Sequence, residues 1–455
     1  MSQFNGLPTA VVGAVEPRRD RVTIFWILLG FFIVGAATVS PLDVWNYIVK
    51  GIGFVLAFGY LIEMIRGRTH VATETILFVA WLTWCLTGAF EQASSFLFRE
   101  AWLTSFQIWV LLVIVAGFTD SRRALSLNLV AFLLAAIILG VYSYATGEYH
   151  AAETRGENAR LEGLTLNANA FGWIMLLAVV ALAYFWMLPA RAKWFKYGIL
   201  LTGFVAAGAS EILTESRKGV LGMAFFFVVW IWMCYRKTLK RNILMLLVVI
   251  VLSVLGGYLG WQYTVQFGGG HRYQEALDTF SGRRTSGSTY IRLENYRLGW
   301  EMFLDNPLTG VGLNGFRVRA PQGDAAHSEY VEIGADTGLP GFILYFGILW
   351  VLWRRCGKLA KYSDSVHVVH VANLTRAVIL TILALDFGRW NYVDKTYWII
   401  LGSFIGFTYA SWRDLRQRAA LQPTGARAGD VPAARSVAGP MAGRPGLPEP
   451  GYPTG

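Results

Sequence analysis

Long apolar runs, separated by short charged loops, fill most of the chain. Each run approaches the ~20 residues that a helix needs to cross a bilayer, and each is too long and too uniformly apolar to be a strand of a membrane barrel. Twelve runs qualify, at residues 22–39, 47–65, 71–90, 101–118, 124–145, 169–188, 197–213, 219–235, 242–262, 338–353, 372–388 and 396–412. The pattern therefore predicts an all-α integral membrane protein with about twelve transmembrane helices.

The charged loops alternate in composition along the chain. Basic residues recur at positions 18–21, 66–68, 122–123, 191–196, 236–241, 354–361 and 413–418. With twelve helices, all of these segments fall on one side, and the positive-inside rule places that side in the cytoplasm. We therefore expect both termini to be cytoplasmic, with residues 1–21 as an N-terminal segment and residues 22–412 as the membrane domain.

The C-terminal segment 413–455 is expected to be a cytoplasmic tail. Beyond residue 419 it is rich in Pro, Gly, Ala and Arg and has no hydrophobic periodicity. A segment of this composition buries too little apolar surface to offset the entropy of ordering its backbone. The sequence therefore predicts a disordered tail.

Composition narrows the class of protein further. Hydrophobic residues make up 55% of the 455 residues and charged residues only 15%, whereas globular domains carry about 25% charged residues. These values exclude a secreted disulfide scaffold and a soluble nucleic-acid binder. The net charge of +11 then reflects basic cytoplasmic loops. The cysteines, at 85, 234 and 356, lie in apolar segments or beside a cytoplasmic loop, so we expect no disulfide.

The long external loop 263–337, between the ninth and tenth predicted helices, is the main candidate for function. It contains seven arginines, nine acidic residues and no lysine. Arginine presents a planar fork that binds phosphate or carboxylate oxygens in pairs. Most of these arginines are expected to pair with acids, but the loop as a whole favours at least one arginine as an anion ligand. Long ordered loops of this kind usually carry function.

Within this loop, residues 289–305 have the pattern of an amphipathic helix. Its apolar stripe includes Trp300, and the sequence Asp305-Asn306-Pro307 predicts its end. The segment is too polar to span a membrane, so we expect it to lie at the interface, with Trp300 at headgroup depth.

Two further positions on the external side combine charge with suitable chemistry. Arg217 and Lys218 lie in a tight external turn, where adjacent basic residues suit either a lipid-linked phosphate or a lipid headgroup. His327 precedes the tenth predicted helix, and a histidine there is able to accept a proton from a hydroxyl group near neutral pH. Glu329, or another carboxylate, is a candidate to orient the His327 ring. The external side has no DxD motif, so no divalent-metal site for a nucleotide-sugar is expected.

Several ordered motifs together resemble the O-antigen ligase and polysaccharide polymerase superfamily of bacterial membrane glycosyltransferases. They are YIRLENYRLGW at 290–300, DNPLTGVGLNGF at 305–316, HSEYVEIGADTGLPG at 327–341, SRKG at 216–219 and NANAFG at 167–172. The first three follow the signature domain of that superfamily over about a hundred residues. Lys218 departs from the pattern, because a small residue is common there.

The resemblance implies a GT-C-like enzyme that transfers a glycan from undecaprenyl diphosphate to an acceptor at the periplasmic face of the bacterial inner membrane, without metal or cofactor. In that interpretation His327 is the general base, and Arg217 and Arg292 bind the donor pyrophosphate. Lys218 is expected to join this anion site. Glu329, Arg297 and Asn169 are expected to support it.

The acceptor is not determined by these motifs. The stretch from His327 to Gly341 favours an O-antigen or exopolysaccharide polymerase, whereas the alternatives are a ligase that uses lipid A-core and a protein O-oligosaccharyltransferase. The expected partners are the lipid-linked donor, a glycan or lipid A-core acceptor, membrane lipids and a chain-length regulator, with no nucleic acid. A transporter would need charges in mid-membrane and paired broken helices. Charges such as Glu63, Arg376 and Asp386 lie towards the ends of predicted spans, so transport is the weaker alternative.

Overall fold

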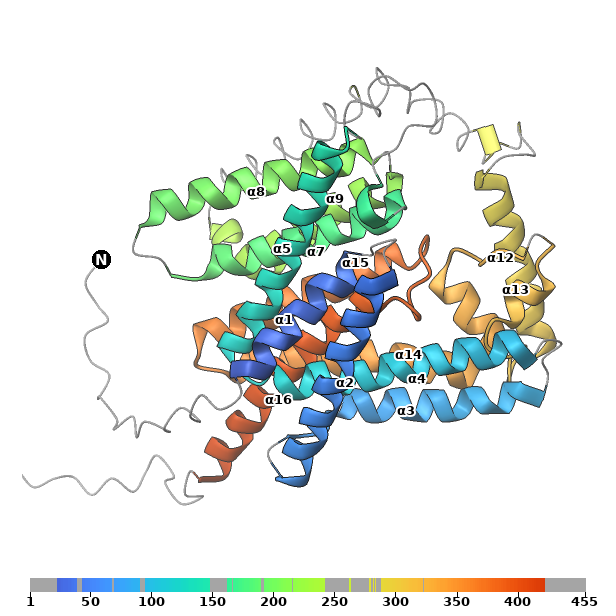
Figure 1. The fold of residues 1–455 in the computed structure, drawn as a ribbon, viewed down its shortest axis with the longest axis horizontal. Helices are drawn as coiled ribbons and strands as arrows, with labels where there is room; N and C mark the ends of the chain where they lie inside the picture. The colour runs from blue at the N-terminus through green and yellow to red at the C-terminus, as the bar shows by residue number, and fades with distance from the viewer. Residues whose placement is uncertain are drawn as a thin grey trace, which may run out of the picture. The chain divides into compact units, whose positions relative to one another are not determined.

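A computed structural model of the chain describes residues 23–38, 43–67, 69–90, 95–147, 162–165, 167–189, 192–214, 216–241, 262, 278–279, 281, 283, 288–321 and 323–421. Its described elements are all helical (Figure 1): α1 (Thr23–Ala37), α2 (Asp43–Ile65), α3 (Thr73–Cys85), η1 (Leu86–Phe90), α4 (Ser95–Phe118), α5 (Arg122–Ala145), η2 (Gly163–Thr165), α7 (Ala168–Met187), α8 (Lys193–Leu213), α9 (Arg217–Arg241), α12 (Ser288–Asp305), α13 (Gly315–Arg319), α14 (Glu329–Tyr362), α15 (Val366–Leu385) and α16 (Lys395–Leu421). The predicted all-α class is confirmed for these residues.

Seven of the described helices are long and apolar enough to cross a membrane. They lie at Tyr47–Ile65, Phe96–Phe118, Arg122–Ala145, Ala168–Met187, Lys218–Arg236, Glu329–Tyr362 and Val366–Leu385, and two shorter apolar helices lie at Ile24–Ala37 and Thr73–Ala89. The chain is therefore a multi-pass membrane protein. The total of twelve stays a prediction, because the ninth predicted helix, 242–262, lies outside the described residues except for residue 262.

The helices differ strongly in how far the protein itself encloses them. In α7, 78% of the apolar window is buried, whereas in α2 the share is 17%. α7 contacts α5, α8, α9 and α15, and α14 contacts α3, α12 and α15. Figure 1 shows α3 and α14 running side by side. α7 and α14 therefore form the interior of the first compact unit, residues 1–413, and α2 leaves most of its apolar surface available to lipid.

α14 consists of two helical segments that meet at Gly338. A short segment from Glu329 precedes this glycine, whose backbone is not helical (φ 65°), and the segment after it agrees with the predicted start of the tenth span at residue 338. The Leu339 N–H donates to the Pro307 carbonyl (2.8 Å), and a Cβ added at Gly338 would lie 2.1 Å from the Leu308 carbonyl oxygen. Glycine is required here because both the positive φ and this close approach exclude a side chain.

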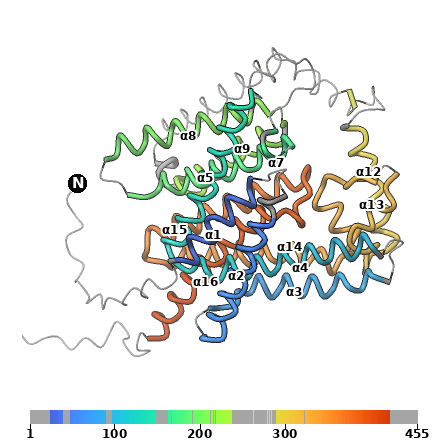
Figure 2. Tube along the Cα trace, viewed as in Figure 1, coloured from blue at the N-terminus to red at the C-terminus, as the bar shows by residue number. Residues whose placement is uncertain are grey.

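The predicted interfacial helix is present as α12, which ends at Asp305 as expected. Figure 2 traces α12 and α13 beside the start of α14. Trp300 on α12 is 60% exposed, so its indole is available to a lipid headgroup, and its membrane depth stays a prediction.

The first residues of the predicted tail belong to helix α16. Residues 414–455 form the second unit, and α16 continues helical to Leu421, because Arg and Ala residues there are good helix formers. The rest of the predicted tail, and the N-terminal segment 1–21, lie outside the described residues.

Candidate active site

His327 occupies a strained position at the start of α14. Its φ of 58° lies in the left-handed region, which is uncommon for residues other than glycine. The segments on either side of it are fixed by hydrogen bonds. The Ala326 N–H donates to Glu332 Oε2 (3.0 Å), and the Ser328 hydroxyl donates to the Asp386 carbonyl (3.3 Å). The surrounding structure therefore determines where the exposed His327 side chain stands.

Three buried carboxylates line one face of the first turns of α14. Glu329, Glu332 and Asp336 are spaced three and four residues apart, which places them on the same side of a helix. Each accepts a backbone N–H from a different segment. Asn391 donates to Glu329 (2.5 Å), Ala326 donates to Glu332, and both Asn314 (2.9 Å) and Phe316 (2.8 Å) donate to Asp336.

These three residues, which we call the α14 carboxylate row, connect the helix to the loop 386–394, to the segment before His327 and to the start of α13. A buried carboxylate needs hydrogen bonds to offset its lost hydration, and irregular segments carry amides that no helix satisfies. The amides of these segments therefore supply the hydrogen bonds that the carboxylates need, and the carboxylates satisfy the amides. Glu329 has a second partner in the Tyr345 hydroxyl (2.5 Å). The role of Glu329 in orienting the His327 ring stays a prediction. The hydrogen bonds that Glu329 forms with Asp386 and Asn391 connect it to the loop 386–394.

Cationic side chains from three helices act electrostatically on His327. Partial desolvation of the ring lowers the pKa of His327 below its usual value, and Lys218, Arg292 and Arg317 lower it further, whereas Asp324 opposes them. Lys218 comes from α9, Arg292 from α12 and Arg317 from α13. The structure thus brings two predicted anion ligands to the predicted base and adds Arg317, to which the sequence had assigned no role. The lowered pKa favours the neutral imidazole, which is the form that is able to accept a proton.

The loop between α15 and α16, residues 386–394, was missed by sequence reasoning. The Tyr296 hydroxyl donates to the Phe387 carbonyl (2.5 Å). A Cβ added at Gly388 would meet Lys218 Cε at 3.0 Å, so the Lys218 stem passes directly over this glycine. The Arg317 guanidinium lies 4.8 Å from the centre of the Trp390 ring, a cation–π distance. The loop therefore contacts α12, α9 and α13.

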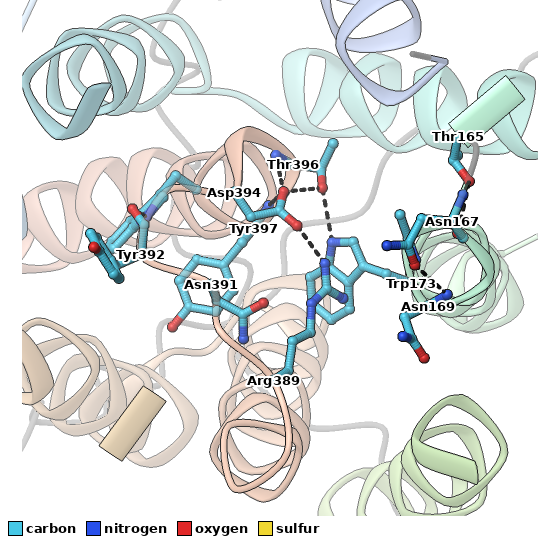
Figure 3. A network of polar contacts seen from close by, with 12 residues as sticks. Thr165, Asn167, Asn169, Trp173, Arg389, Asn391, Tyr392, Asp394, Thr396 and Tyr397 are labelled. Atoms are coloured by element: carbon cyan, nitrogen blue, oxygen red, sulfur yellow. Dashed lines mark hydrogen bonds and ion pairs between the residues drawn. The ribbon is translucent and has the colours of Figure 1, made fainter. Parts of the chain in front are cut away.

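Arg389 in the same loop is held by a network of its own, shown in Figure 3. Its guanidinium lies over the Trp173 ring of α7, 4.3 Å from the ring centre, and forms an ion pair with Asp394. Asp394 also accepts the Thr396 hydroxyl (2.6 Å), which in turn accepts the Trp173 N–H (2.9 Å). This network ties the loop to α7.

The two motifs NANAFG and SRKG meet in space. Asn167 caps α7 through the amides of Asn169 and Ala170, and the Ser216 hydroxyl donates to Asn169 Oδ1 (2.9 Å). Ser216 also accepts the Gly219 N–H (3.2 Å) at the start of α9. Asn169 therefore connects α7 to the first turn of α9, and its supporting role at the site stays a prediction. The Arg217 side chain lies outside the described parts of the structure.

The glycines of these motifs make room for a buried acid. A Cβ added at Gly219 would lie 1.3 Å from Glu211 Oε1, and one added at Gly172 would lie 2.5 Å from it. Glu211 is 1% exposed, and Arg389 is the cation that acts on it electrostatically. Glycine at both positions lets the Glu211 carboxylate sit between the first turns of α7 and α9.

Arg297 takes a peripheral position. It pairs with Glu301 one turn further along α12 (3.0 Å), and its side chain is 74% exposed. Exposed pairs of this kind contribute little to stability, and the supporting role of Arg297 stays a prediction.

No group of three or more His, Cys, Asp or Glu side chains is arranged to hold a metal ion in the described part of the chain. The metal-free mechanism remains a prediction.

Comparisons with known proteins agree with the motifs. The family model Wzy_C, described as O-Antigen ligase, matches residues 202–346, a range that contains Lys218, Arg292, Arg317, His327 and the α14 carboxylate row. A solved structure described as "Structural coordination of polymerization and crosslinking by a peptidoglycan synthase complex" is similar over 76% of this chain and 98% of its own, with 14% identity and a TM-score of 0.44. No curated protein sequence gives a significant match. Because the family match spans the residues that converge on His327, the resemblance of this chain to the O-antigen ligase and polymerase superfamily is confirmed.

Proposed function

We propose that this protein is a glycosyltransferase that moves a glycan from undecaprenyl diphosphate onto an acceptor hydroxyl at the periplasmic face of the bacterial inner membrane. The observation that carries the proposal is the convergence of Lys218, Arg292 and Arg317 on His327 at the start of α14. The family match supports ligase or polymerase activity in general. The donor, the face of the membrane and the residue roles are our own assignment.

The chemistry needs one base and one anion site. Neutral His327 accepts the proton of the acceptor hydroxyl as the oxygen attacks the anomeric carbon of the donor. The bond between that carbon and the phosphate oxygen breaks, and undecaprenyl diphosphate leaves with both electrons of the bond. Arg217, Arg292 and Lys218 neutralise the charge that develops on the pyrophosphate, as preorganised cations do in other transferases. Arg317, stacked on Trp390, adds a fourth positive charge near the same position.

Neutral His327 fits this role because desolvation of the ring and its cationic neighbours lower its pKa. The same cations would bind a pyrophosphate, whose negative charge offsets part of their effect and raises the proton affinity of the base once the donor is bound. The arrangement thus keeps the base unprotonated before binding and strengthens it afterwards. A protonated histidine surrounded by three cations would be inactive as a base.

Within this function, polymerisation of O-antigen or exopolysaccharide repeats is our first assignment, on the sequence of residues 327–341. Ligation to lipid A-core is the alternative. A chain-length regulator is an expected partner in the polymerase assignment. Protein glycosylation and transport rank below both.

Replacement of His327 by alanine in cells tests the function and separates the two assignments. General base catalysis contributes about 10²–10⁴ in rate, so we expect transfer to be lost. If single repeat units persist on their normal carrier and long chains disappear, the protein is a polymerase. If long lipid-linked chains accumulate and fail to reach the final acceptor, it is a ligase. Wild-type glycan in cells that contain normal amounts of the variant would disprove the role of His327.

A further inference from the structure

We propose that Glu332 is a positioning residue for the general base, and that its carboxylate fixes the backbone conformation on which His327 stands. This inference rests on the proposed function, in which His327 accepts the proton. Glu332 itself contacts neither donor nor acceptor in this proposal, because its side chain is fully buried.

The first step of the argument is the backbone of His327. A histidine with a φ of 58° is not held there by its own preference, since this region is unfavourable for residues with a Cβ. Unusual backbone conformations persist where the surroundings over-determine them, and they occur often at functional sites. The groups that hold the neighbouring residues therefore decide where the imidazole points.

The second step is that Glu332 contacts the chain on both sides of His327. Its Oε2 accepts the Ala326 N–H (3.0 Å), and its own N–H donates to the Ser328 carbonyl (3.0 Å). One residue thus binds the residue before His327 through its side chain and the residue after it through its main chain. Glu332 and Ala326 are both 0% exposed, so water does not compete for the side-chain bond.

The third step distinguishes Glu332 from the other members of the α14 carboxylate row. Glu329 binds the amide of Asn391 and the hydroxyl of Tyr345, and Asp336 binds the amides of Asn314 and Phe316. Those contacts order the loop 386–394 and α13. The contact made by Glu332 is with the residue adjacent to His327, so a change at Glu332 acts on the base first.

The bond to Ala326 needs an acceptor oxygen and not a negative charge. Glutamine keeps an oxygen at the same distance along the side chain, whereas leucine has none. A positioning role therefore predicts that Glu332→Gln retains activity and Glu332→Leu does not. A role as a proton-relay acid predicts that both variants lose activity, because an amide does not accept and release protons at neutral pH.

The test compares purified wild-type protein, Glu332→Gln, Glu332→Leu and Glu63→Leu in lipid nanodiscs that contain the lipid-linked donor. Glu63→Leu is the matched control, because Glu63 is a partly buried acid on α2 that pairs with Arg66. We expect Glu332→Leu to lower kcat about 100-fold, the usual cost of a misplaced catalytic group, with an unchanged KM for the donor. Glu332→Gln should stay within about threefold of wild type, as in a positioning role whose acceptor is kept.

Two results would overturn the inference: wild-type kcat in Glu332→Leu, or an equal loss of kcat in a folded Glu332→Gln. If leucine prevents folding, Glu332→Met takes its place, because methionine has a flexible chain of similar length and no carbonyl oxygen to accept the Ala326 N–H. His327→Ala separates this inference from the proposed function. An active His327→Ala variant disproves the proposed base, whereas an inactive His327→Ala variant beside an active Glu332→Leu variant disproves only the positioning role.

Discussion

The two ends of α14 bury charge in different ways. In the C-terminal half, Arg355 pairs with Glu74 of α3, and their side chains are 6% and 0% exposed. Arg355 also donates to the Ile405 carbonyl of α16 (3.3 Å). In the N-terminal turns, the α14 carboxylate row has main-chain amides as its partners. One end joins helix to helix through side chains, and the other joins helix to loops through the backbone.

The difference shows what each kind of contact is suited to do. A side-chain ion pair connects elements whose backbones are already satisfied, so it contributes to how the helices assemble. A carboxylate that binds amides orders segments that have no hydrogen-bonded ladder of their own. The first kind of contact belongs to the fold of this protein, and the second kind belongs to its site.

The largest expected effect is a loss of glycan transfer without a loss of stability. His327→Ala should reduce glycan transfer by about 10²–10⁴-fold without lowering the midpoint of thermal unfolding, because the side chain is exposed. His370→Ala on α15 is the control, since it lies on the predicted cytoplasmic side. Transfer rates and unfolding of the purified variants provide the measurement. A large loss of stability in His327→Ala would show that the site and the fold are not separable at this end.

The next effect tests the ion pair. Glu74→Leu leaves the Arg355 guanidinium buried without its acid, and removal of one partner from such a pair costs about 3–5 kcal/mol. Arg355→Met should cost a similar amount, whereas the double variant should recover most of it because the two apolar side chains pack together. Unfolding in detergent measures all three variants. A single variant as stable as wild type would mean that the pair does not hold α3 to α14.

A smaller effect is expected from one amide at the other end. Asp336→Asn keeps one acceptor oxygen but turns an NH₂ group toward the second amide, so either Asn314 or Phe316 loses its partner. An unsatisfied buried amide costs about 1–3 kcal/mol. We expect faster hydrogen exchange in α13 and little change in α3. Asp305→Asn, at the exposed end of α12, is the control, and equal exchange in both variants would contradict the ordering role of the row.

The smallest effect concerns pH. Lys218 lowers the pKa of His327, and a base loses activity as the pH falls through its pKa. Lys218→Met keeps the aliphatic stem over Gly388 and removes the charge, so the pKa of His327 rises and the acidic limb of the pH–rate profile moves to higher pH. Lys193→Met, at the start of α8, should leave the limb in place. A shift toward lower pH, or no shift, would contradict the placement of Lys218 beside the base.

Hydropathy predicted most of the described spans because each of them satisfies its own backbone and exposes apolar side chains to lipid. It gave no indication of the short helix at 329–337, within the predicted loop, because Glu329, Glu332 and Asp336 interrupt its apolar pattern. The burial of these carboxylates depends on amides from segments that are distant in sequence. The order of residues along the chain does not show which amides lie near which carboxylate. The same limit hid Arg389 and Trp390, whose loop binds Ser328 and Glu329, next to His327, only after α15 and α16 have packed.

The motifs were more informative about chemistry than about contacts. They identified His327, Lys218 and Arg292, which the structure brings together, because a proton acceptor and anion ligands have few alternatives among the side chains. Arg317 is an arginine like Arg292, but its neighbours along the sequence did not indicate that it stacks on Trp390. The supporting amide contacts of Glu332 carry no sequence signature, since any residue except proline offers an N–H.

The short connection between α15 and α16 has a practical consequence for mapping the sidedness of this protein. By length, residues 386–394 look like an ideal place for an epitope or a reporter fusion. Because these residues contact α7, α9, α12 and α13, an insertion there would disturb Lys218 and Arg317 and with them the proposed site, so the tagged protein would report an orientation without the proposed activity. Insertions for such experiments belong instead in connections remote from His327, such as the turn between α14 and α15.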